Sequence, residues 1–193
     1  MTTIARLDTL TPIHKGLRRA LFETAIHLAR TDFAAPDEVA AATQKVGEIL
    51  DFLREHAEHE DREVLPIVAR LDPRLAEQLH VDHTQLERLA IAVESLWPRL
   101  EALDVPLARA QLGAELARRF NALVAAQVVH MDREEREMNA VLWAHLGDDE
   151  LGQLSKRIVS AIPPARMQQW GSLVEPSLNG TERRIAAARR AAA

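Results

Sequence analysis

The chain contains no cysteine and no tyrosine. The absence of cysteine excludes disulfide bonds, cysteine-ligated zinc or iron–sulfur centres, and thiol nucleophiles. The absence of tyrosine excludes tyrosyl-radical chemistry and acid–base catalysis by a phenol. Aromatic residues make up only 4% of the sequence, which leaves few side chains on which nucleic-acid bases could stack. Any metal ion must therefore be held by histidine and carboxylate side chains.

An excess of positive charge and long apolar runs are also missing. The formal net charge is −5 and the pI is near 5.9, whereas a nucleic-acid-binding protein is expected to carry a basic patch. No stretch approaches the ~18 uncharged apolar residues of a membrane span. Residues 1–10 include Arg6 and Asp8 and have no continuous apolar segment, so we expect no signal peptide. These features predict a cytoplasmic protein without nucleic-acid or membrane partners.

Glycine is scarce, and most of the nine prolines stand where helices are expected to begin or end. Thr11 and Asp72 each precede a proline, a pattern typical of a helix N-cap followed by the first turn. Pro66 is expected to kink its helix or to end it near Leu65. The composition and the spacing of apolar residues predict an all-α fold. The expected helices cover residues 12–30, 36–70, 73–103, 106–145 and 148–161.

The four longer expected helices are joined by short connections. Such helices pack most simply as an up-down-up-down four-helix bundle, which we predict for residues 11–146. Residues 147–193 are expected to form a C-terminal helical extension packed on the bundle. This extension is also the surface at which we would look for a protein partner or a homodimer.

One sequence pattern occurs twice, as His56-Ala-Glu-His-Glu60-Asp-Arg-Glu63 and His130-Met-Asp-Arg-Glu134-Glu-Arg-Glu137. Residues four apart on a helix point the same way from successive turns. Each His-x3-Glu pair can therefore hold one cation from one side. Imidazole with carboxylate suits iron, manganese or zinc, and a carboxylate can also bridge two ions.

Each of the other two long helices carries a histidine on its apolar stripe. Buried carboxylates that face one another cost several kcal/mol unless a cation compensates them, so the combined set predicts a site for two metal ions. His80 lies one turn from His83 but about 60° from the centre of the stripe, so its role as an extra ligand stays open. The candidate metal ligands are His14, His56, Glu60, His83, His130 and Glu134.

Two further carboxylates, Glu63 and Glu137, repeat in both copies. They are candidates for accepting hydrogen bonds from the ligand imidazoles, or for pairing with nearby arginines, Arg62 among them. A metal-free or single-metal helical interaction module is the alternative of another class, because His-x3-Glu pairs also occur as weak surface contacts on helices. A ferritin-like site would need Glu three residues before His on two helices, and only Glu77 with His80 has that spacing.

The order of these motifs resembles the hemerythrin-like, or HHE cation-binding, domain family. The resemblance rests on a lone His14, on His-x3-Glu followed by Asp and a later Leu-Pro over residues 56–66, on Asp-His-x2-Leu over residues 82–86, and on His-x3-Glu-Glu over residues 130–135. It implies a non-haem di-iron site bridged by Glu60 and Glu134 and capped by the four histidines. Members bind dioxygen, sense oxygen or iron, respond to nitric oxide, or serve in iron–sulfur repair.

The expected function is therefore binding or sensing of dioxygen, nitric oxide or peroxide at a centre of two non-haem iron ions, with manganese or zinc as alternative metals. Disproportionation of peroxide by the same centre is an enzymatic alternative. The chain departs from the family pattern at Ala140, which stands where Pro66 stands in the first copy, and this change is expected to straighten the helix.

Overall fold

All regular secondary structure in the described part of the chain, residues 6–192, is helical. The structure is a computed structural model, and for residues 188–192 it describes only the path of the backbone. Residues 1–5, part of the stretch expected not to be a signal peptide, lie outside the described residues, as does residue 193. The predicted all-α class is confirmed. None of the described helices has both the length and the apolar character needed to span a lipid bilayer.

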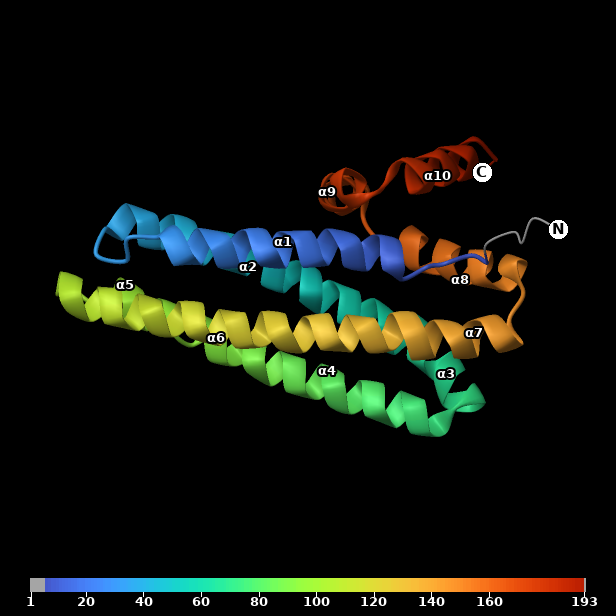
Figure 1. Ribbon diagram of the computed structural model, residues 1–193, viewed down its shortest axis with the longest axis horizontal. Coiled ribbons are helices and arrows are strands. Elements are labelled where there is room, and N and C mark those ends of the chain that lie inside the picture. The colour runs from blue at the N-terminus through green and yellow to red at the C-terminus, as the bar shows by residue number, and fades with distance from the viewer. Residues whose placement is uncertain (1–5, 193) are drawn as a thin grey trace.

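Four long helices, α1, α2, α4 and α6, lie side by side (Figure 1), and each contacts two of the others. Short π-helical turns, Glu60–Val64 and Glu134–Met138, join α2 to α3 and α6 to α7. The predicted boundary after residue 146 falls in the connection between α7 and α8. The helices are α1 (Thr11–Arg30), α2 (Pro36–His59), α3 (Leu65–Leu71), α4 (Pro73–Glu94), α5 (Trp97–Glu101), α6 (Pro106–Arg133), α7 (Asn139–His145), α8 (Asp148–Ala161), α9 (Pro164–Val174) and α10 (Gly180–Ala192).

Two of the predicted N-caps have different outcomes. Asp72 caps α4 as expected, because its carboxylate accepts a hydrogen bond from the backbone N–H three residues further on (3.0 Å). Thr11 does not cap α1. The Asp8 carboxylate instead accepts hydrogen bonds from the backbone N–H groups of Leu10 (3.0 Å) and Thr11 (2.9 Å), and from the Asn139 amide (3.3 Å). Burial alone would raise the pKa of Asp8, but these hydrogen bonds hold it below its usual value.

The π-helical turns lie at equivalent places in the two sequence copies. In each, the carbonyl of the first residue accepts a hydrogen bond from the N–H five residues further on. Pro66 does not end the helix near Leu65, because the helical path continues through α3 to Leu71. The expected straightening at Ala140 is not seen in the hydrogen bonds, since the second copy forms the same π turn without a proline. The turn therefore does not depend on proline.

Buried apolar side chains form two clusters separated by a polar layer. The larger cluster occupies one half of the helix array and includes Leu17, Leu50, Leu86, Phe120 and Met131. The smaller cluster includes Leu10, Val64, Leu79, Met138 and Leu142. The candidate ligands lie between the two clusters on every long helix: His83, for example, lies between Leu79 and Leu86 on α4. This layer places polar side chains at full depth in the core.

Of the C-terminal helices, α9 packs on α1 (Figure 1) and α8 contacts the π turn that follows α2. Trp170 of α9 is buried, and its ring lies edge-on to Phe52 of α2 with 4.7 Å between ring centroids. Gly16 allows the close approach of the end of α9 to α1, because a Cβ at this position would lie 3.1 Å from the Cα of Val174. Arg19 of α1 also donates a hydrogen bond to the Leu173 carbonyl (2.9 Å).

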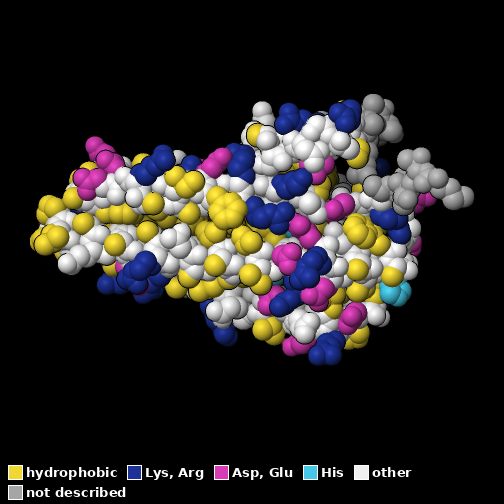
Figure 2. Space-filling view, viewed as in Figure 1, with side chains coloured by type: hydrophobic (Ala, Val, Ile, Leu, Met, Phe, Trp, Pro, Cys, Tyr) yellow, Lys and Arg dark blue, Asp and Glu magenta, His cyan; other side chains and the backbone are white. Residues whose placement is uncertain are grey.

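Charged and apolar side chains are unevenly distributed over the face seen in Figure 2. Apolar side chains predominate at the end formed by α5 and the start of α6, where Val105 and Leu107 are 60% and 70% exposed. Acidic and basic side chains gather over the other half of the molecule. The ion pairs in that half include Arg18 with Glu135 and Arg136 with Asp132.

Gly113 of α6 accommodates the connection between α1 and α2. A Cβ at this position would lie 2.0 Å from Cγ of the buried Phe33 ring. We expect Gly113→Ala to destabilise the fold by about 1–3 kcal/mol, because the ring must move out of a packed site. The matched control is Gly171→Ala in α9, where a Cβ meets nothing within 4 Å and where alanine should stabilise the helix by up to ~1 kcal/mol. Urea unfolding of the two variants checks the opposite signs, and equal effects would contradict the packing argument.

Candidate metal centre

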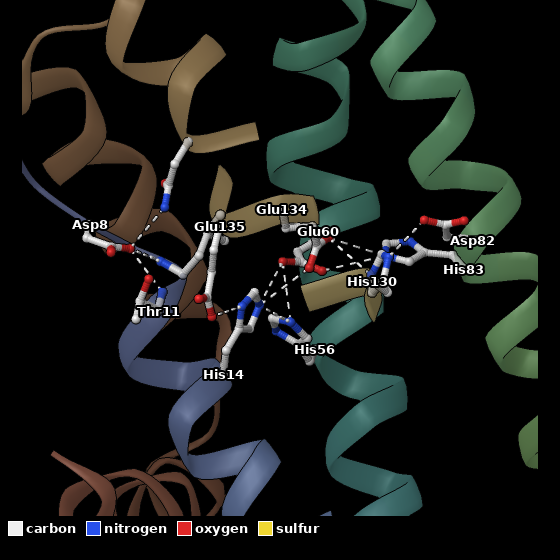
Figure 3. A network of polar contacts seen from close by, with 12 residues as sticks. Asp8, Thr11, His14, His56, Glu60, Asp82, His83, His130, Glu134 and Glu135 are labelled. Atoms are coloured by element: carbon white, nitrogen blue, oxygen red, sulfur yellow. Dashed lines mark hydrogen bonds and ion pairs between the residues drawn. The ribbon is translucent and has the colours of Figure 1, made fainter. Parts of the chain in front are cut away.

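The structure brings all six predicted ligands together between the four long helices (Figure 3). They form two groups of four residues in which the potential ligand atoms all lie within 4.8 Å of one another. Two residues, Glu60 and Glu134, belong to both groups. The first group adds His14 and His56, and the second adds His83 and His130. These buried groups could hold metal ions.

Each shared carboxylate points one oxygen at each histidine pair. Glu60 Oε1 lies 3.3 Å from Nε2 of His56, and its Oε2 lies 3.6 Å from Nε2 of His83. Glu134 Oε2 lies 3.4 Å from Nε2 of His14, and its Oε1 lies 3.2 Å from Nε2 of His130. Each of the two carboxylates thus links the two groups of histidines.

None of the four oxygens of these carboxylates accepts a hydrogen bond from the described residues. The side chains of Glu60 and Glu134 are 3% and 0% exposed, so water cannot readily solvate them. Leaving a buried polar group unpaired costs about 1–3 kcal/mol, and more when the group is charged. Four buried oxygens without a hydrogen-bond donor, each facing an imidazole, form a group that could hold a cation.

The histidines of each pair converge on a common point. Nε2 of His14 lies 3.1 Å from Nε2 of His56, and the same distance separates the Nε2 atoms of His83 and His130. Two nitrogens bound to one metal ion at about 2.1 Å and at a right angle lie roughly 3.0 Å apart. The spacing within each pair therefore fits two imidazoles that share one ion.

The charges of the centre shift the pKa values in opposite directions. Burial lowers the pKa of His14 and His83, but the carboxylates around each ring outweigh it and raise these values to about 9 and about 11. For His56 burial dominates, and its pKa falls to about 4. Burial would raise the pKa of Glu60, yet the surrounding imidazoles hold it well below its usual value. Without metal, a protonated His14 and a protonated His83 supply one compensating charge on each side of the carboxylates.

Three of the four imidazoles contact a carboxylate through their outer nitrogen. Nδ1 of His14 donates to Glu135 (3.0 Å) and Nδ1 of His83 donates to Asp61 (2.8 Å). Each of these acids directly follows a shared glutamate in a π turn, so the first residue of the turn points into the centre and the second holds an imidazole of a neighbouring helix. Such contacts fix the ring and its tautomer and leave Nε2 for a metal.

The third outer contact joins His130 of α6 to Asp82 of α4, with 3.4 Å between Nδ1 and the nearer carboxylate oxygen. Arg133 also donates to Asp82. Arg18 likewise lies 2.7 Å from the Glu135 carboxylate. The arginines hold the acids that in turn hold the imidazoles, so the ring orientations depend on a network that reaches the surface.

The prediction that Glu63 and Glu137 accept hydrogen bonds from the imidazoles is wrong. Glu63 pairs with Arg62 and Arg157, each at 3.2 Å, which agrees with the alternative of arginine pairing. Among the described residues Glu137 is exposed and has no contact with a histidine of the centre. The residues that sequence reasoning missed are Asp61, Asp82 and Glu135. The sequence contains a sign of all three. Asp61 and Glu135 each directly follow the ligand glutamate of their copy, and Asp82 directly precedes His83.

His80 lies outside both ligand groups. Its side chain is exposed on α4, and it contributes to the wall of a cavity of about 240 Å³ between α2, α4 and α6. This cavity reaches His56, His83 and His130. Its wall also includes the buried Gln127, three residues before His130. The cavity gives a small molecule a path to the centre.

Comparisons with models of known protein families, with curated proteins and with solved structures found no match to this chain. The functional assignment therefore depends on the geometry of the centre and on the resemblance of its motifs.

We expect Asp61→Asn and Glu135→Gln each to lower metal affinity by about 10–100-fold, because a neutral amide orients and polarises the imidazole less than a carboxylate does. Competition with a chromophoric chelator measures the affinity for Zn²⁺ or Fe²⁺. The matched control is Glu63→Gln, which removes a charge from the same π turn but touches no imidazole of the centre. A loss in the control as large as in Asp61→Asn would show that net charge, and not ring orientation, sets the affinity.

Proposed function

We propose that this chain is a hemerythrin-like protein in which an up-down-up-down bundle of the four long helices holds two non-haem iron ions. Such a centre would bind or sense a small oxidant, namely dioxygen, nitric oxide or peroxide. The observation that carries the proposal is the set of four buried carboxylate oxygens without hydrogen bonds, placed between two converging pairs of imidazole nitrogens. The ligands are His14, His56, Glu60, His83, His130 and Glu134.

The donor set supports the choice of metal chemistry. Two imidazoles and two shared carboxylates give each ion four protein atoms, which leaves coordination positions for a small molecule. A pair of iron ions supplies reversible electron transfer to small oxidants when bound. The residues of the chain would orient the imidazoles, offset part of the positive charge of the ions with two carboxylates, and exclude bulk water by burial in the polar layer. The choice of iron over manganese or zinc follows the resemblance of the motifs.

Metal analysis of protein purified without chelator tests the proposal. We expect about two iron ions per chain, as the two ligand groups require, with the absorption of a bridged ferric pair in the oxidised protein. Glu60→Ala should reduce the iron content, because it removes a donor from both groups. Less than one metal ion of any kind per chain would refute the proposal.

Exposure of the reduced, iron-loaded protein to each small oxidant identifies the ligand. Dioxygen or nitric oxide should change the visible spectrum, and the change should reverse when the gas is removed if the role is binding or sensing. Continuous consumption of peroxide without loss of iron would favour the enzymatic alternative. A spectrum indifferent to all three molecules would exclude an oxidant-binding role even for a protein that holds iron.

A further inference from the structure

A second cavity reaches the metal centre from the side of the C-terminal helices. It has a volume of about 150 Å³ and lies between the start of α1, the end of α2 with its π turn, α8 and α9. His56 and Glu60 form its inner end. The 240 Å³ cavity also touches His56, so both cavities reach the first ligand group.

The walls of the two cavities differ in polarity. Charged side chains, among them Arg54, Glu58 and Glu87, line the larger cavity together with its apolar residues. The smaller cavity has a largely apolar wall drawn from both core clusters and from the C-terminal helices: Ile13, Val64, Ile158, Ile162, Met167 and Trp170. An apolar cavity favours uncharged molecules, because a charged or strongly polar ligand would lose its hydration without compensation.

One polar group in this wall has no partner. Trp170 is 5% exposed, and its indole N–H is buried without a hydrogen-bond acceptor among the described residues. A buried tryptophan N–H is normally paired. The edge-on contact with Phe52 holds the indole ring in place. The cavity wall thus contains a fixed indole ring whose N–H has no acceptor among the described residues.

We propose that this cavity, built by α8 and α9 against the bundle, binds an uncharged diatomic gas of the size of nitric oxide or dioxygen beside His56 and Glu60. The volume suits this class, since a largely apolar cavity of about 150 Å³ accommodates small apolar molecules, xenon included. Val159 of α8, which is 50% exposed, marks the place where the cavity meets solvent. The delivery of the gas to iron rests on the proposed function, whereas occupancy of the cavity does not.

Xenon is the probe for occupancy. Methyl groups of the full-length chain are observed by NMR under xenon pressure, in the metal-free and in the zinc-substituted protein. We expect saturable shifts for the methyls of Ile162 and Met167, and none for Ile49 in the core or for Ile91 on the surface. Absence of saturable shifts at Ile162 and Met167 would overturn the proposal, even if the metal analysis finds iron. Saturable shifts in a protein that binds no iron would support the cavity and refute the di-iron function.

Filling the cavity tests its role at the iron. Ile162→Trp should abolish the xenon shift of Met167 and slow nitric oxide binding to the iron-loaded protein at least tenfold. Ala161→Trp is the matched control, because it places the same ring on the preceding, exposed residue of α8, and it should change neither value. Ser155→Leu, a smaller change in the same wall, serves if the larger variant does not fold. Wild-type xenon shifts and wild-type binding rates in the filled variants would overturn the proposal.

Discussion

Glu134→Gln is expected to abolish the stabilisation of the fold by metal. The side chain has no exposed surface and gives one oxygen to each histidine pair, so the neutral amide weakens both cation positions at once. Saturating metal stabilises a native state by about 2.7 kcal/mol at 100 times the dissociation constant. In a chain of this size that energy raises the melting temperature by roughly 5–10 °C. We expect such a rise in the wild type and none in the variant, with metal content reduced in parallel.

The metal-free state separates this effect from misfolding. Burial and the charge of Glu60 both act to raise the pKa of Glu134, although the surrounding imidazoles hold it below its usual value. The amide relieves the repulsion between the two carboxylates but leaves the imidazole cations less compensated, so the metal-free variant should keep its helical content. The control is Glu137→Gln on the same helical path, an exposed position away from the imidazoles, which should retain both metal and the thermal shift. Wild-type metal loading in Glu134→Gln would remove Glu134 from the ligand set.

Helical periodicity carried most of the information about the fold and the ligands. A histidine on an apolar stripe, such as His14 or His83, is detectable because burial follows the 3.6-residue repeat. The same helical period predicts that His56 and Glu60, four residues apart, point the same way. Their role as metal ligands is still a prediction, but the structure brings the predicted residues into one layer.

The same periodicity gave a wrong prediction of which acids contact the imidazoles. On a regular α-helix Glu63 shares a face with Glu60, whereas Asp61 points about 100° away. The π turn changes that relation, and Asp61 reaches His83 on α4. No periodic sequence pattern predicts a π turn. Proline does not predict one either, since Pro66 follows the first π turn but Ala140 stands at the equivalent place after the second. These contacts depend on the neighbouring helix and could not be read from one helix alone.

The position of the C-terminal helices on the bundle could not be predicted from sequence patterns either. The helices themselves follow from composition, and α8 ends at Ala161 as expected. Their position depends on the missing side chain of Gly16 and on a hydrogen bond from Arg19 to a backbone carbonyl. Neither feature has a periodic signature. The cavity beside His56 therefore emerges only when the extension is placed on the bundle.

The stability of the metal-free protein is expected to fall as pH rises from 6.5 to 9. His14 and His83 have folded-state pKa values of about 9 and about 11, above the ordinary value of 6.5. The folded chain therefore keeps two protons that the unfolded chain releases over this range, and stability decreases with pH. The contribution of each group is complete below pH 6.5 and is lost as pH rises through the folded pKa. An increase in pH from 6.5 to about 9 therefore corresponds to a loss of stability on the order of 3 kcal/mol for each group.

The other titrating groups of the centre do not cancel this loss. The pKa of His56 is lowered to about 4, so its contribution is present above pH 6.5 and is lost only in acid. Glu60 and Glu134 have lowered pKa values and stay ionised throughout the range. The loaded protein should show the opposite trend, because imidazoles bind metal only after losing the proton at the binding nitrogen, so affinity increases with pH.

Urea unfolding of chelator-treated and loaded protein at pH 6.5, 8 and 9 measures both trends. The variant His14→Gln should flatten the metal-free profile, since it removes one of the three imidazoles with a raised pKa, namely His14, His83 and His130. The control is His145→Gln at an exposed position of α7, which should leave the profile unchanged. If the metal-free protein gains stability with pH, the compensating charges between the two carboxylates are not protons on His14 and His83, and another cation must remain in the centre.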